Sequence, residues 1–221
     1  MNLPVIILGA GGHAKVLIDT LLRNSVSIIG LTDMKEETFG GKVVGFHVIG
    51  PDDELLQYPP ESVQLVNGLG STNATGRRKL LYEKFKQMGY SFLTVIHPSA
   101  IIAHDVHLAE GVQVMAGAII QTESAVGENS IINTRATIEH DCVIGPHVHI
   151  APGATISGGA VLGQGTFIGV SATVIQNIRI GEFATIAAGA IIIKNIPAGA
   201  TAMGVPANVF EKNERLEKNP Y

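Results

Sequence analysis

Residues 132–156 read INTRATIEHDCVIGPHVHIAPGATI, and an isoleucine recurs at every sixth position of this stretch. The spacing extends in both directions without a gap, because every sixth residue from Ile96 to Ile192 is isoleucine, leucine or valine. An α-helix repeats every 3.6 residues and a strand every two residues, so neither element alone explains a period of six. Hexapeptide repeats of this kind are typical of a parallel β-helix.

The other positions of the repeat predict the shape of one coil. We expect each hexapeptide to form one side of a triangular prism, with the large aliphatic residue inside and a small residue, such as Ala136, inside the corner. Glycine and asparagine accept the positive φ that such corners need. The expected corner residues of this kind are Gly111, Gly117, Asn129, Gly153, Gly159, Gly165 and Asn195.

Three hexapeptides make one coil, so the seventeen repeats predict between five and six coils. Aliphatic residues eighteen apart should then stack in columns, with neighbouring coils about 4.8 Å apart. One such column is Ile120, Ile138, Ile156, Val174 and Ile192. Both ends of the stack need a cap, and we expect the preceding domain to cover one end and the segment after Ile196 to cover the other.

The composition of the 221 residues excludes several classes of protein. The net charge of −4 offers no basic field for nucleic acid, and no stretch of eighteen apolar residues is present that could span a membrane. A signal peptide is absent from the N-terminal residues, and a single cysteine cannot form an internal disulfide, which together favour the cytoplasm. That cysteine, Cys142, occupies a small inward position and is expected to pack rather than react.

The first 95 residues follow a different pattern, in which strand-like and helix-like runs alternate. We expect helices over Ala14–Arg23 and Asn73–Met88, and an edge strand or hairpin over Lys42–Ile49. This alternation predicts a small α/β domain over residues 1–95 and a repeat domain over residues 96–221. The expected buried strands are Pro4–Leu8, Ser27–Leu31, Ser62–Asn67 and Tyr90–Val95.

The buried faces of the two helices follow from their apolar spacing. The first helix should bury Val16, Leu17, Thr20 and Leu21. The second should bury Leu81, Phe85 and Met88. Ser71 or Thr72 can cap the start of the second helix, and Gly89 suits the position just after its end.

A glycine-rich turn links the first expected strand to the first helix. Residues 9–13 read GAGGH, and such a turn lets backbone N–H groups approach a phosphate at a helix N-terminus. Asp33 follows the next strand, where a carboxylate can hold a ribose hydroxyl. The domain is too short for two mononucleotide-binding halves, so a mononucleotide or nucleotide sugar fits better than NAD. The alternative is a tight turn that binds nothing.

Polar residues that interrupt the repeat pattern are candidates for chemistry. His140 lies between Glu139 and Asp141, at an outward or corner position of its repeat. A neutral imidazole is the usual general base near neutral pH, and an adjacent carboxylate can fix its tautomer and raise its basicity. The alternative is an inert surface histidine. The polar cluster that we assign to this one coil is Asn133, Glu139, His140, Asp141, His147 and His149.

Three further histidines, His97, His104 and His107, allow a zinc hypothesis. His104 and His140 are thirty-six residues apart and therefore two coils apart, about 10 Å, which is too far for a shared zinc ion within one subunit. A site between subunits could still bring such histidines together. The alternative is that all three are solvated.

A Gly-Gly-His turn that opens a small α/β domain, the hexapeptide repeats, residues 138–145 (IEHDCVIG) and residues 204–207 (GVPA) occur together in this chain. In this combination it resembles the bacterial nucleotide-sugar acetyltransferases of the PglD and NeuD type, from Val5 to about Val209. The resemblance implies a mixed fold, with a Rossmann-like domain followed by a left-handed parallel β-helix. It also implies a homotrimer with active sites between neighbouring subunits.

For the PglD type, the resemblance implies N-acetylation of the amine of a UDP-linked 4-amino-4,6-dideoxy sugar, with acetyl-CoA as co-substrate and no metal ion. His140 matches the catalytic base and Asp141 its acidic neighbour. His149, Val170 and Ala188 match contacts to acetyl-CoA. The substrate-binding positions are Gly11, Gly12, His13, Thr32, Asp33, Gly70 and Asn133.

Two positions depart from the PglD pattern. Thr32 stands where that type has a second acid, which puts the nucleotide preference in doubt, and Ala188 replaces a glycine. The implied mechanism is direct transfer, in which His140 takes a proton from the sugar amine. A donor from His149 or a backbone N–H stabilises the thioester oxygen.

Three alternative functions stay open on the sequence. The first is O-acetylation of a sialic-acid-type sugar, which the NeuD type carries out. The second is a zinc enzyme of the γ-carbonic-anhydrase type, which shares the β-helix and needs three histidines that converge across subunits. The third is a non-catalytic scaffold in which the repeats only trimerise the chain.

Overall fold

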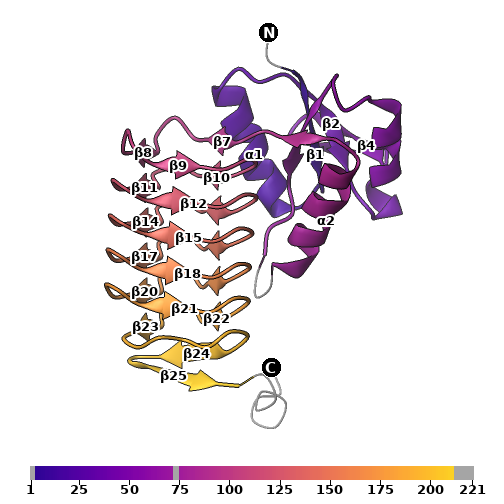
Figure 1. Cartoon of the computed structure of the whole chain (residues 1–221). Helices are drawn as coiled ribbons and strands as arrows, with labels where there is room; N and C mark the ends of the chain where they lie inside the picture. Colours follow the sequence, from indigo (N-terminus) through magenta and orange to yellow (C-terminus); the bar gives the residue numbers. More distant parts are fainter. Residues whose placement is uncertain (1–2, 72–74, 212–221) are drawn as a thin grey trace.

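The computed structural model describes residues 3–71 and 75–211. Figure 1 shows two parts, an α/β part built from the first residues and a long stack of coils built from the rest. Among the described residues, no helix is long and apolar enough to cross a membrane.

The α/β part is a six-stranded sheet with the order β3-β4-β2-β1-β5-β6. Its strands pair in parallel except for the β3–β4 hairpin. Apolar residues of α1 pack on one face of this sheet, and Tyr82 and Phe85 of α2 pack on the other. The expected strands and hairpin are confirmed, with bounds that differ by a few residues. The elements are β1 (Val5–Leu8), α1 (Gly12–Arg23), β2 (Ile28–Thr32), η1 (Glu36–Thr38), β3 (Lys42–Val43), β4 (Phe46–Gly50), η2 (Asp52–Gln57), β5 (Gln64–Asn67), α2 (Gly76–Gln87) and β6 (Ser91–Phe92).

The predicted burial of α1 is partly wrong. Leu17, Thr20 and Leu21 are buried as expected, and Ala14 and Ile18 join them. Val16, which was expected to be buried, is 43% exposed. Ala14, Leu17, Ile18 and Leu21 share the helix face that packs on the sheet, and Val16 lies outside that face.

The prediction for α2 also needs correction. The helix begins at Gly76 rather than Asn73, and its N-cap is Thr75, without a capping side chain. The expected cap at Ser71 does not form, and Thr72 and Asn73 lie outside the described residues. Gly89 has the expected left-handed backbone, with φ +90°.

The buried face of α2 differs from the prediction because a polar residue belongs to it. Arg78, Tyr82 and Phe85 are buried, whereas Leu81 is only half-buried and Met88 is exposed. Apolar spacing alone could not show this, because α2 packs on the coil stack as well as on the sheet.

The repeats form a three-sided prism. The β10 sheet contains β7 (Val95–Ile96), β10 (Gln113–Val114), β13 (Ile131–Ile132), β16 (His149–Ile150), β19 (Phe167–Ile168), β22 (Thr185–Ile186), β24 (Thr201–Gly204) and β25 (Ala207–Phe210). The β11 sheet contains β8 (Ile101–Ile102), β11 (Ile119–Ile120), β14 (Thr137–Ile138), β17 (Thr155–Ile156), β20 (Thr173–Val174) and β23 (Ile191–Ile192). The β12 sheet contains β9 (His107–Leu108), β12 (Ala125–Val126), β15 (Val143–Ile144), β18 (Val161–Leu162) and β21 (Arg179–Ile180).

Strands of neighbouring coils pair in parallel with a register of eighteen residues, as predicted. Ile120 pairs with Ile138, Ile138 with Ile156, Ile156 with Val174 and Val174 with Ile192. All members of this column are at most 1% exposed. The predicted column is therefore confirmed, and so is the inward position of Cys142.

The corners adopt the left-handed backbone at the fourth position of the repeat. The predicted glycines and Asn129 have positive φ, but Asn195 does not, because the last coil departs from the repeat. Larger residues also occupy this conformation, including Arg135 and Asp141, at φ +57° and +59°. A backbone hydrogen bond to the preceding coil holds each of them, from Arg135 N to Ala116 O (2.9 Å) and from Asp141 N to Thr122 O (3.1 Å).

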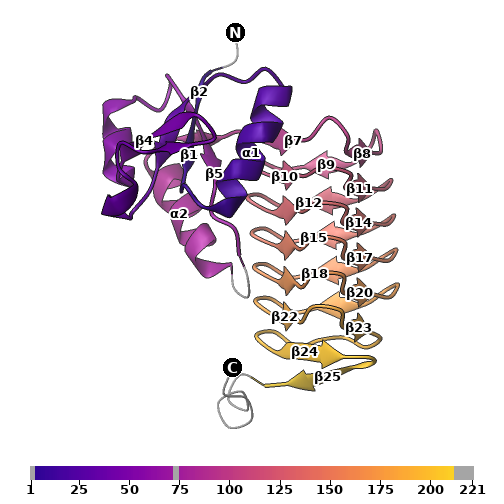
Figure 2. The same cartoon turned by 180° about the vertical axis from the view of Figure 1, so that it is seen from behind.

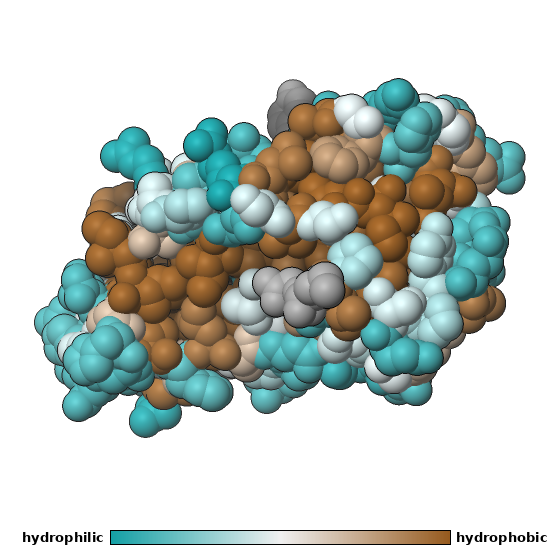
Figure 3. Space-filling model, turned by 90° about the horizontal axis from the view of Figure 1, so that it is seen from above, coloured by the Kyte–Doolittle hydropathy of each residue, from teal (hydrophilic) through white to brown (hydrophobic). Residues whose placement is uncertain are grey.

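One end of the stack is not closed in the way that was predicted. Figures 1 and 2 show the α/β part beside the upper coils rather than across their end. Ile96 is 38% exposed, Ile102 and Leu108 are half-buried, and Figure 3 shows an extended hydrophobic surface on this end. The other end is covered as predicted, because β24 continues the β10 sheet and pairs with β25 in a hairpin.

Replacing Ile156 by alanine should lower the free energy of unfolding by about 2–5 kcal/mol, because the cavity would lie between two stacked coils. Urea unfolding followed by circular dichroism at a fixed protein concentration measures the change. Leu80→Ala is the control, because Leu80 is 68% exposed and should change little. Equal losses in the two variants would contradict the stacked column.

Candidate active site

The α/β part covers the outer surface of the β10 sheet. The outward side chains Gln113, Ile131, His149 and Phe167 are all at most 7% exposed, although they point away from the prism core. Just before α2, the Thr75 hydroxyl donates to Gly165 O of the coil stack (2.8 Å). A histidine of the coil stack, His149, is thereby brought beside the glycine-rich turn.

The glycine-rich turn leaves the start of α1 open. Gly11 is the N-cap and has no side chain to satisfy the first N–H groups of the helix. A Cβ atom added to Gly11 or Gly12 would meet no heavy atom within 4 Å, so there is free space beside both residues. Unsatisfied N–H groups next to open space favour an anion such as a phosphate.

Asp33 braces this turn from the end of β2. Its Oδ2 accepts a hydrogen bond from Ala10 N (2.8 Å) and its Oδ1 accepts one from Lys35 N (3.0 Å). Beside it, Thr32 is fully buried and its hydroxyl donates to Asp52 Oδ1 (2.5 Å). A carboxylate from η2 therefore lies next to Thr32, and sequence spacing gave no signal for Asp52.

His13 lies in the first turn of α1 and contacts the coil stack. Its Nε2 lies 2.7 Å from Gln113 Oε1 on β10. Burial lowers the pKa of His13 to about 4, and the positive charge of Arg78 contributes to this shift. Gly70 packs beside the ring, because a Cβ added to Gly70 would lie 3.3 Å from His13 Cβ.

His149 and Asn133 form a second pair on the coil stack. Asn133 Oδ1 accepts a hydrogen bond from Thr134 N (2.8 Å), and Asn133 Nδ2 lies 3.1 Å from His149 Nε2. With this orientation of the amide, Nδ2 donates and His149 Nε2 accepts, so the ring proton is on Nδ1. Burial lowers the pKa of His149 to about 3, and the ring is therefore neutral at physiological pH.

His140 and Asp141 lie on a different corner of the prism. The turn between β14 and β15 carries both, and His140 Nδ1 lies 2.6 Å from Asp141 Oδ2. Both side chains are more than half exposed. The hydrogen bond to Asp141 raises the pKa of His140 and lowers that of Asp141. Asp141 thus fixes the Nδ1 proton and leaves Nε2 as a basic nitrogen.

The His140 ring rests on the next coil at Gly158. A Cβ added to Gly158 would lie 2.6 Å from His140 Cε1 and 2.7 Å from Nε2. Only glycine leaves room for the ring in this position, so Gly158 determines where the imidazole can lie. The sequence reasoning missed this residue, although its spacing of eighteen from His140 was available.

A single chain does not bring the predicted site residues together. Asn133, Val170 and Ala188 follow strands of the β10 sheet, on the corner that leads to the β11 sheet, and His149 lies at the same edge. His140 and Asp141 lie on the next corner, between the β11 and β12 sheets. The width of the β11 sheet therefore separates His140 from the other residues of the predicted cluster.

A hollow of about 510 Å³ follows the corner that carries Val170. Its lining residues are Thr134, Arg135, Pro152, Gly153, Thr155, Val170 and Ser171. The hollow is open to solvent along several successive coils and could accept an extended ligand that runs along the stack.

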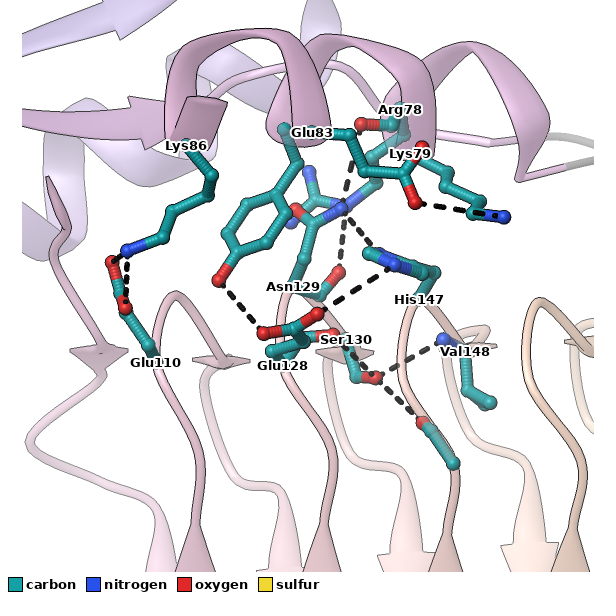
Figure 4. Close-up of polar contacts among 12 residues, drawn as sticks. Arg78, Lys79, Glu83, Lys86, Glu110, Glu128, Asn129, Ser130, His147 and Val148 are labelled. Atoms are coloured by element: carbon teal, nitrogen blue, oxygen red, sulfur yellow. Dashed lines mark hydrogen bonds and ion pairs between the residues drawn. The ribbon is translucent and has the colours of Figure 1, made fainter. Parts of the chain in front are cut away.

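His147, which the sequence analysis assigned to the same polar cluster as His140 and His149, belongs to neither group. It is 2% exposed beneath α2, and its Nδ1 lies 3.0 Å from Asn129 Nδ2 (Figure 4). Burial lowers the pKa of His147 to about 4. Figure 4 shows that the ring lies among Arg78, Asn129 and Glu128, where it contributes to the packing of α2 on the coils.

No set of three histidine, cysteine or acidic residues comes close enough to bind a metal ion within the described part of one chain. One of the three histidines of the zinc hypothesis, His97, accepts a hydrogen bond at Nδ1 from Ser99 N (3.1 Å).

Comparison with known proteins gives consistent matches. Residues 4–85 match the PglD N-terminal domain, and residues 123–158 match the bacterial transferase hexapeptide (six repeats). A curated UDP-N-acetylbacillosamine N-acetyltransferase from Bacillus subtilis is 36% identical over 116 residues, which are 51% of this chain and 51% of that protein. The match thus spans about half the length of this curated relative.

Two solved structures match almost the whole chain. A histidine-to-asparagine mutant of perosamine N-acetyltransferase from Caulobacter crescentus, in complex with CoA and GDP-perosamine, is 34% identical with a TM-score of 0.88, and the match covers 94% of this chain and 96% of that chain. The acetyltransferase domain of PglB from Neisseria gonorrhoeae, in complex with acetyl coenzyme A, is 32% identical with a TM-score of 0.87. This match covers 95% of this chain and 100% of that chain. These matches confirm the expected fold class, a Rossmann-like domain followed by a left-handed parallel β-helix.

Asp141→Asn should lower the pKa of His140, because an amide cannot stabilise the imidazolium as a carboxylate does. An NMR titration of the His140 ring in the unliganded protein measures this change. The pKa of His147, which is buried far from Asp141, provides the internal reference. An unchanged His140 titration would show that the two side chains are not paired in solution.

Gly158→Ala should displace the His140 ring and reduce the raised pKa of His140 toward its ordinary value. The backbone of Gly158 is outside the left-handed region, so alanine is tolerated there and the effect is steric. The same NMR titration measures it, with Gly76→Ala as the control, since a Cβ at Gly76 meets no atom within 4 Å. A His140 pKa identical to that of the wild type would contradict the contact.

Proposed function

The chain belongs to the bacterial sugar N-acetyltransferases in which a PglD-type N-terminal domain precedes a hexapeptide-repeat β-helix, and on this basis we propose that it transfers the acetyl group of acetyl-CoA to the amine of a nucleotide-linked sugar. Two relatives of the same architecture support this proposal: one binds CoA and GDP-perosamine, and the other binds acetyl coenzyme A. N-acetylation is therefore favoured over O-acetylation of a sialic-acid-type sugar.

The observation that carries the proposal is the His140–Asp141 pair on an open corner. The sugar amine attacks the thioester carbonyl of acetyl-CoA, and His140 Nε2 takes the proton that the amine loses. The tetrahedral intermediate then collapses, the carbon–sulfur bond breaks, and the imidazolium returns the proton to the departing thiolate. Asp141 keeps Nε2 available and stabilises the imidazolium that forms between these steps.

The nucleotide part of the substrate binds at the start of α1 in this proposal. The free N–H groups beside Gly11 and Gly12 donate hydrogen bonds to the diphosphate, and His13 and Gly70 border the space next to it. Thr32 and Asp33 lie at the base end of the site, with Asp52 paired to Thr32. We expect a UDP-linked 4-amino-4,6-dideoxy sugar, with a GDP-linked sugar as the second candidate because the relative from Caulobacter crescentus binds GDP-perosamine.

Acetyl-CoA extends along the corner that carries Val170 and Ala188, in the hollow of about 510 Å³. Asn133 lies at the upper end of this corner, and its amide can donate its second hydrogen to the thioester oxygen. His149 positions this amide by accepting the first hydrogen at Nε2. Transition-state stabilisation by a fixed donor of this kind is a large term in acyl transfer.

We propose that the active site lies between two copies of the chain in a homotrimer. His140 and Asn133 are on different corners of one prism, so the base must reach the acyl group of a neighbouring copy. Exposed aliphatic residues near these corners, such as Ile101 and Val143, support such an interface. Residues 1–95 would supply the nucleotide-sugar site and residues 96–221 the acetyl-CoA site. Both co-substrates and the free thiol of Cys142 favour a cytoplasmic location.

His140→Ala should lower the turnover number by about 10²- to 10⁴-fold, the usual range for a lost acid–base group. Release of the CoA thiol during transfer to the amino sugar measures the rate, and circular dichroism checks the fold. His47→Ala is the matched control, because His47 is exposed on β4. Unchanged turnover in His140→Ala would remove His140 from the mechanism.

Co-expression of His140→Ala with Asn133→Ala tests the shared site. Mixed oligomers contain some interfaces with an intact His140 from one copy and an intact Asn133 from the next, so activity should exceed that of either variant alone. If both groups act within one chain, the activity of the mixture will not exceed the average of the two variants.

A further inference from the structure

A relay of three polar groups crosses the boundary between the α/β part and the coil stack. Gln113 Nε2 donates to Asn67 O (2.8 Å), and Gln113 Oε1 lies 2.7 Å from His13 Nε2. Gln113 is 1% exposed, on the outer surface of β10, and Asn67 ends β5. No motif or family model singles out Gln113, which nonetheless contacts a residue of the nucleotide-sugar turn.

The relay determines which nitrogen of His13 carries the proton. A backbone carbonyl only accepts, so the Gln113 amide must direct its NH₂ group toward Asn67 and its oxygen toward His13. An amide oxygen also only accepts, so His13 Nε2 must be the donor. A neutral imidazole has one N–H group, and Nδ1 of His13 therefore carries a lone pair.

Burial and the positive charge of Arg78 keep the His13 ring neutral. Burial is the larger cause of the pKa near 4, and the Arg78 guanidinium is the second. Arg78 is itself buried, and it donates to Asn67 O (2.7 Å), Leu69 O (2.8 Å) and Asn129 O (3.0 Å). The lowered pKa of Arg78, about 9, still leaves it charged at neutral pH. His149, whose own pKa is lowered by burial and by the charge of a protonated His13, has a pKa of about 3 and is also neutral.

Arg78 also fixes the segment that borders the His13 ring. Its Nη1 bonds hold the carbonyls of Asn67 and Leu69, and Gly70 follows directly and packs against His13. Figure 4 shows Arg78 beside Asn129 at the start of α2. The ring is thus held between β10 and this segment, with one nitrogen engaged.

The second nitrogen of His13 is free to meet a ligand. Nδ1 has no hydrogen-bond partner among the described residues, and it is not among their buried unpartnered atoms, unlike His149 Nδ1. The ring lies at the open start of α1 against Gln113 of β10, and Asn133 and His149 lie on the next two coils of the same side of the prism. The sugar of a bound nucleotide sugar would lie beside this ring. A diphosphate has no proton to donate at neutral pH, whereas a sugar hydroxyl or amine has one.

We infer that Gln113 is a positioning residue, which fixes the His13 proton on Nε2 so that Nδ1 accepts a hydrogen bond from the amino sugar. This inference rests on the proposed function. It assigns Gln113 to recognition of the sugar and not to the acyl transfer step.

Two substitutions distinguish a role of Gln113 in positioning the His13 proton from a merely structural role. In Gln113→Leu the proton is no longer fixed, and KM for the nucleotide sugar should rise roughly 2- to 10-fold at all pH values, the size of one lost hydrogen bond. In Gln113→Glu a carboxylate stabilises the imidazolium and raises the pKa of His13. KM for the nucleotide sugar should then rise as the pH falls through that new pKa, because Nδ1 gains a proton below it.

KM for acetyl-CoA and kcat at saturating sugar should stay unchanged in both variants. Gln87→Glu is the matched control, because Gln87 is exposed at the last residue of α2. The substrates are UDP- and GDP-linked 4-amino-4,6-dideoxy sugars, and thermal melting reports whether each variant folds. A folded Gln113→Leu protein with wild-type KM for the sugar would overturn the inference.

Nitrogen-15 NMR of the His13 ring in the unliganded wild-type protein is the second measurement. We expect a protonated-type signal from Nε2 and an unprotonated-type signal from Nδ1, and an imidazolium pattern in Gln113→Glu near neutral pH. A proton on Nδ1, or a mixture of tautomers, would overturn the inference without any assay. If the wild-type protein acetylates neither sugar, the proposed function fails and so does the substrate role of Nδ1, even with the expected tautomer.

Discussion

The parallel pairing of each coil with the coil eighteen residues away is the constraint on which the structure depends. It aligns the buried columns, and it also holds the corners, because a corner N–H bonds to a carbonyl of the preceding coil. Gly159 N donates to His140 O (2.9 Å) and Asp141 N donates to Thr122 O (3.1 Å). These bonds keep Asp141 in a left-handed backbone that costs about 1–2 kcal/mol for a residue with a side chain. Backbone bonds between coils therefore hold the corner that presents the His140–Asp141 pair.

The histidines of this chain show how burial selects a role for one residue type. Burial lowers the pKa of His13, His147 and His149, so these rings act as neutral donors and acceptors. His140 is exposed and paired with a carboxylate, and its pKa is raised. A base near neutral pH needs an exposed ring paired with a carboxylate, and a fixed neutral tautomer needs a buried ring. The sequence alone could not separate the two groups, because it does not show which histidines the α/β part covers.

The repeat domain was predictable from the sequence because its core depends on one local period. The column from Ile120 to Ile192 and the inward Cys142 both follow from that period. The position of the α/β part did not, because side chains of β10, such as Gln113, meet residues about a hundred positions earlier in the chain. The same reason explains the error at Met88, because α2 packs on the coil stack as well as on the sheet. It also explains why the motifs did not show that one chain keeps His140 and Asn133 on different corners. The candidate residues were found by type and motif, whereas their grouping required the three-dimensional arrangement.

The α/β part is attached to the side of the stack, so the number of coils determines the distance from the α/β part to any corner along the prism axis. Thr75 bonds to Gly165 and Arg78 bonds to Asn129, so the nucleotide-sugar turn is fixed at a set height along the prism axis. Each coil adds about 4.8 Å to that axis. Removal of one eighteen-residue unit between an anchored coil and a reactive corner would preserve the core and yet shift the two by that distance. The number of coils between the anchor and the reactive corner thus sets the length of nucleotide sugar that can extend from the nucleotide-sugar turn to that corner.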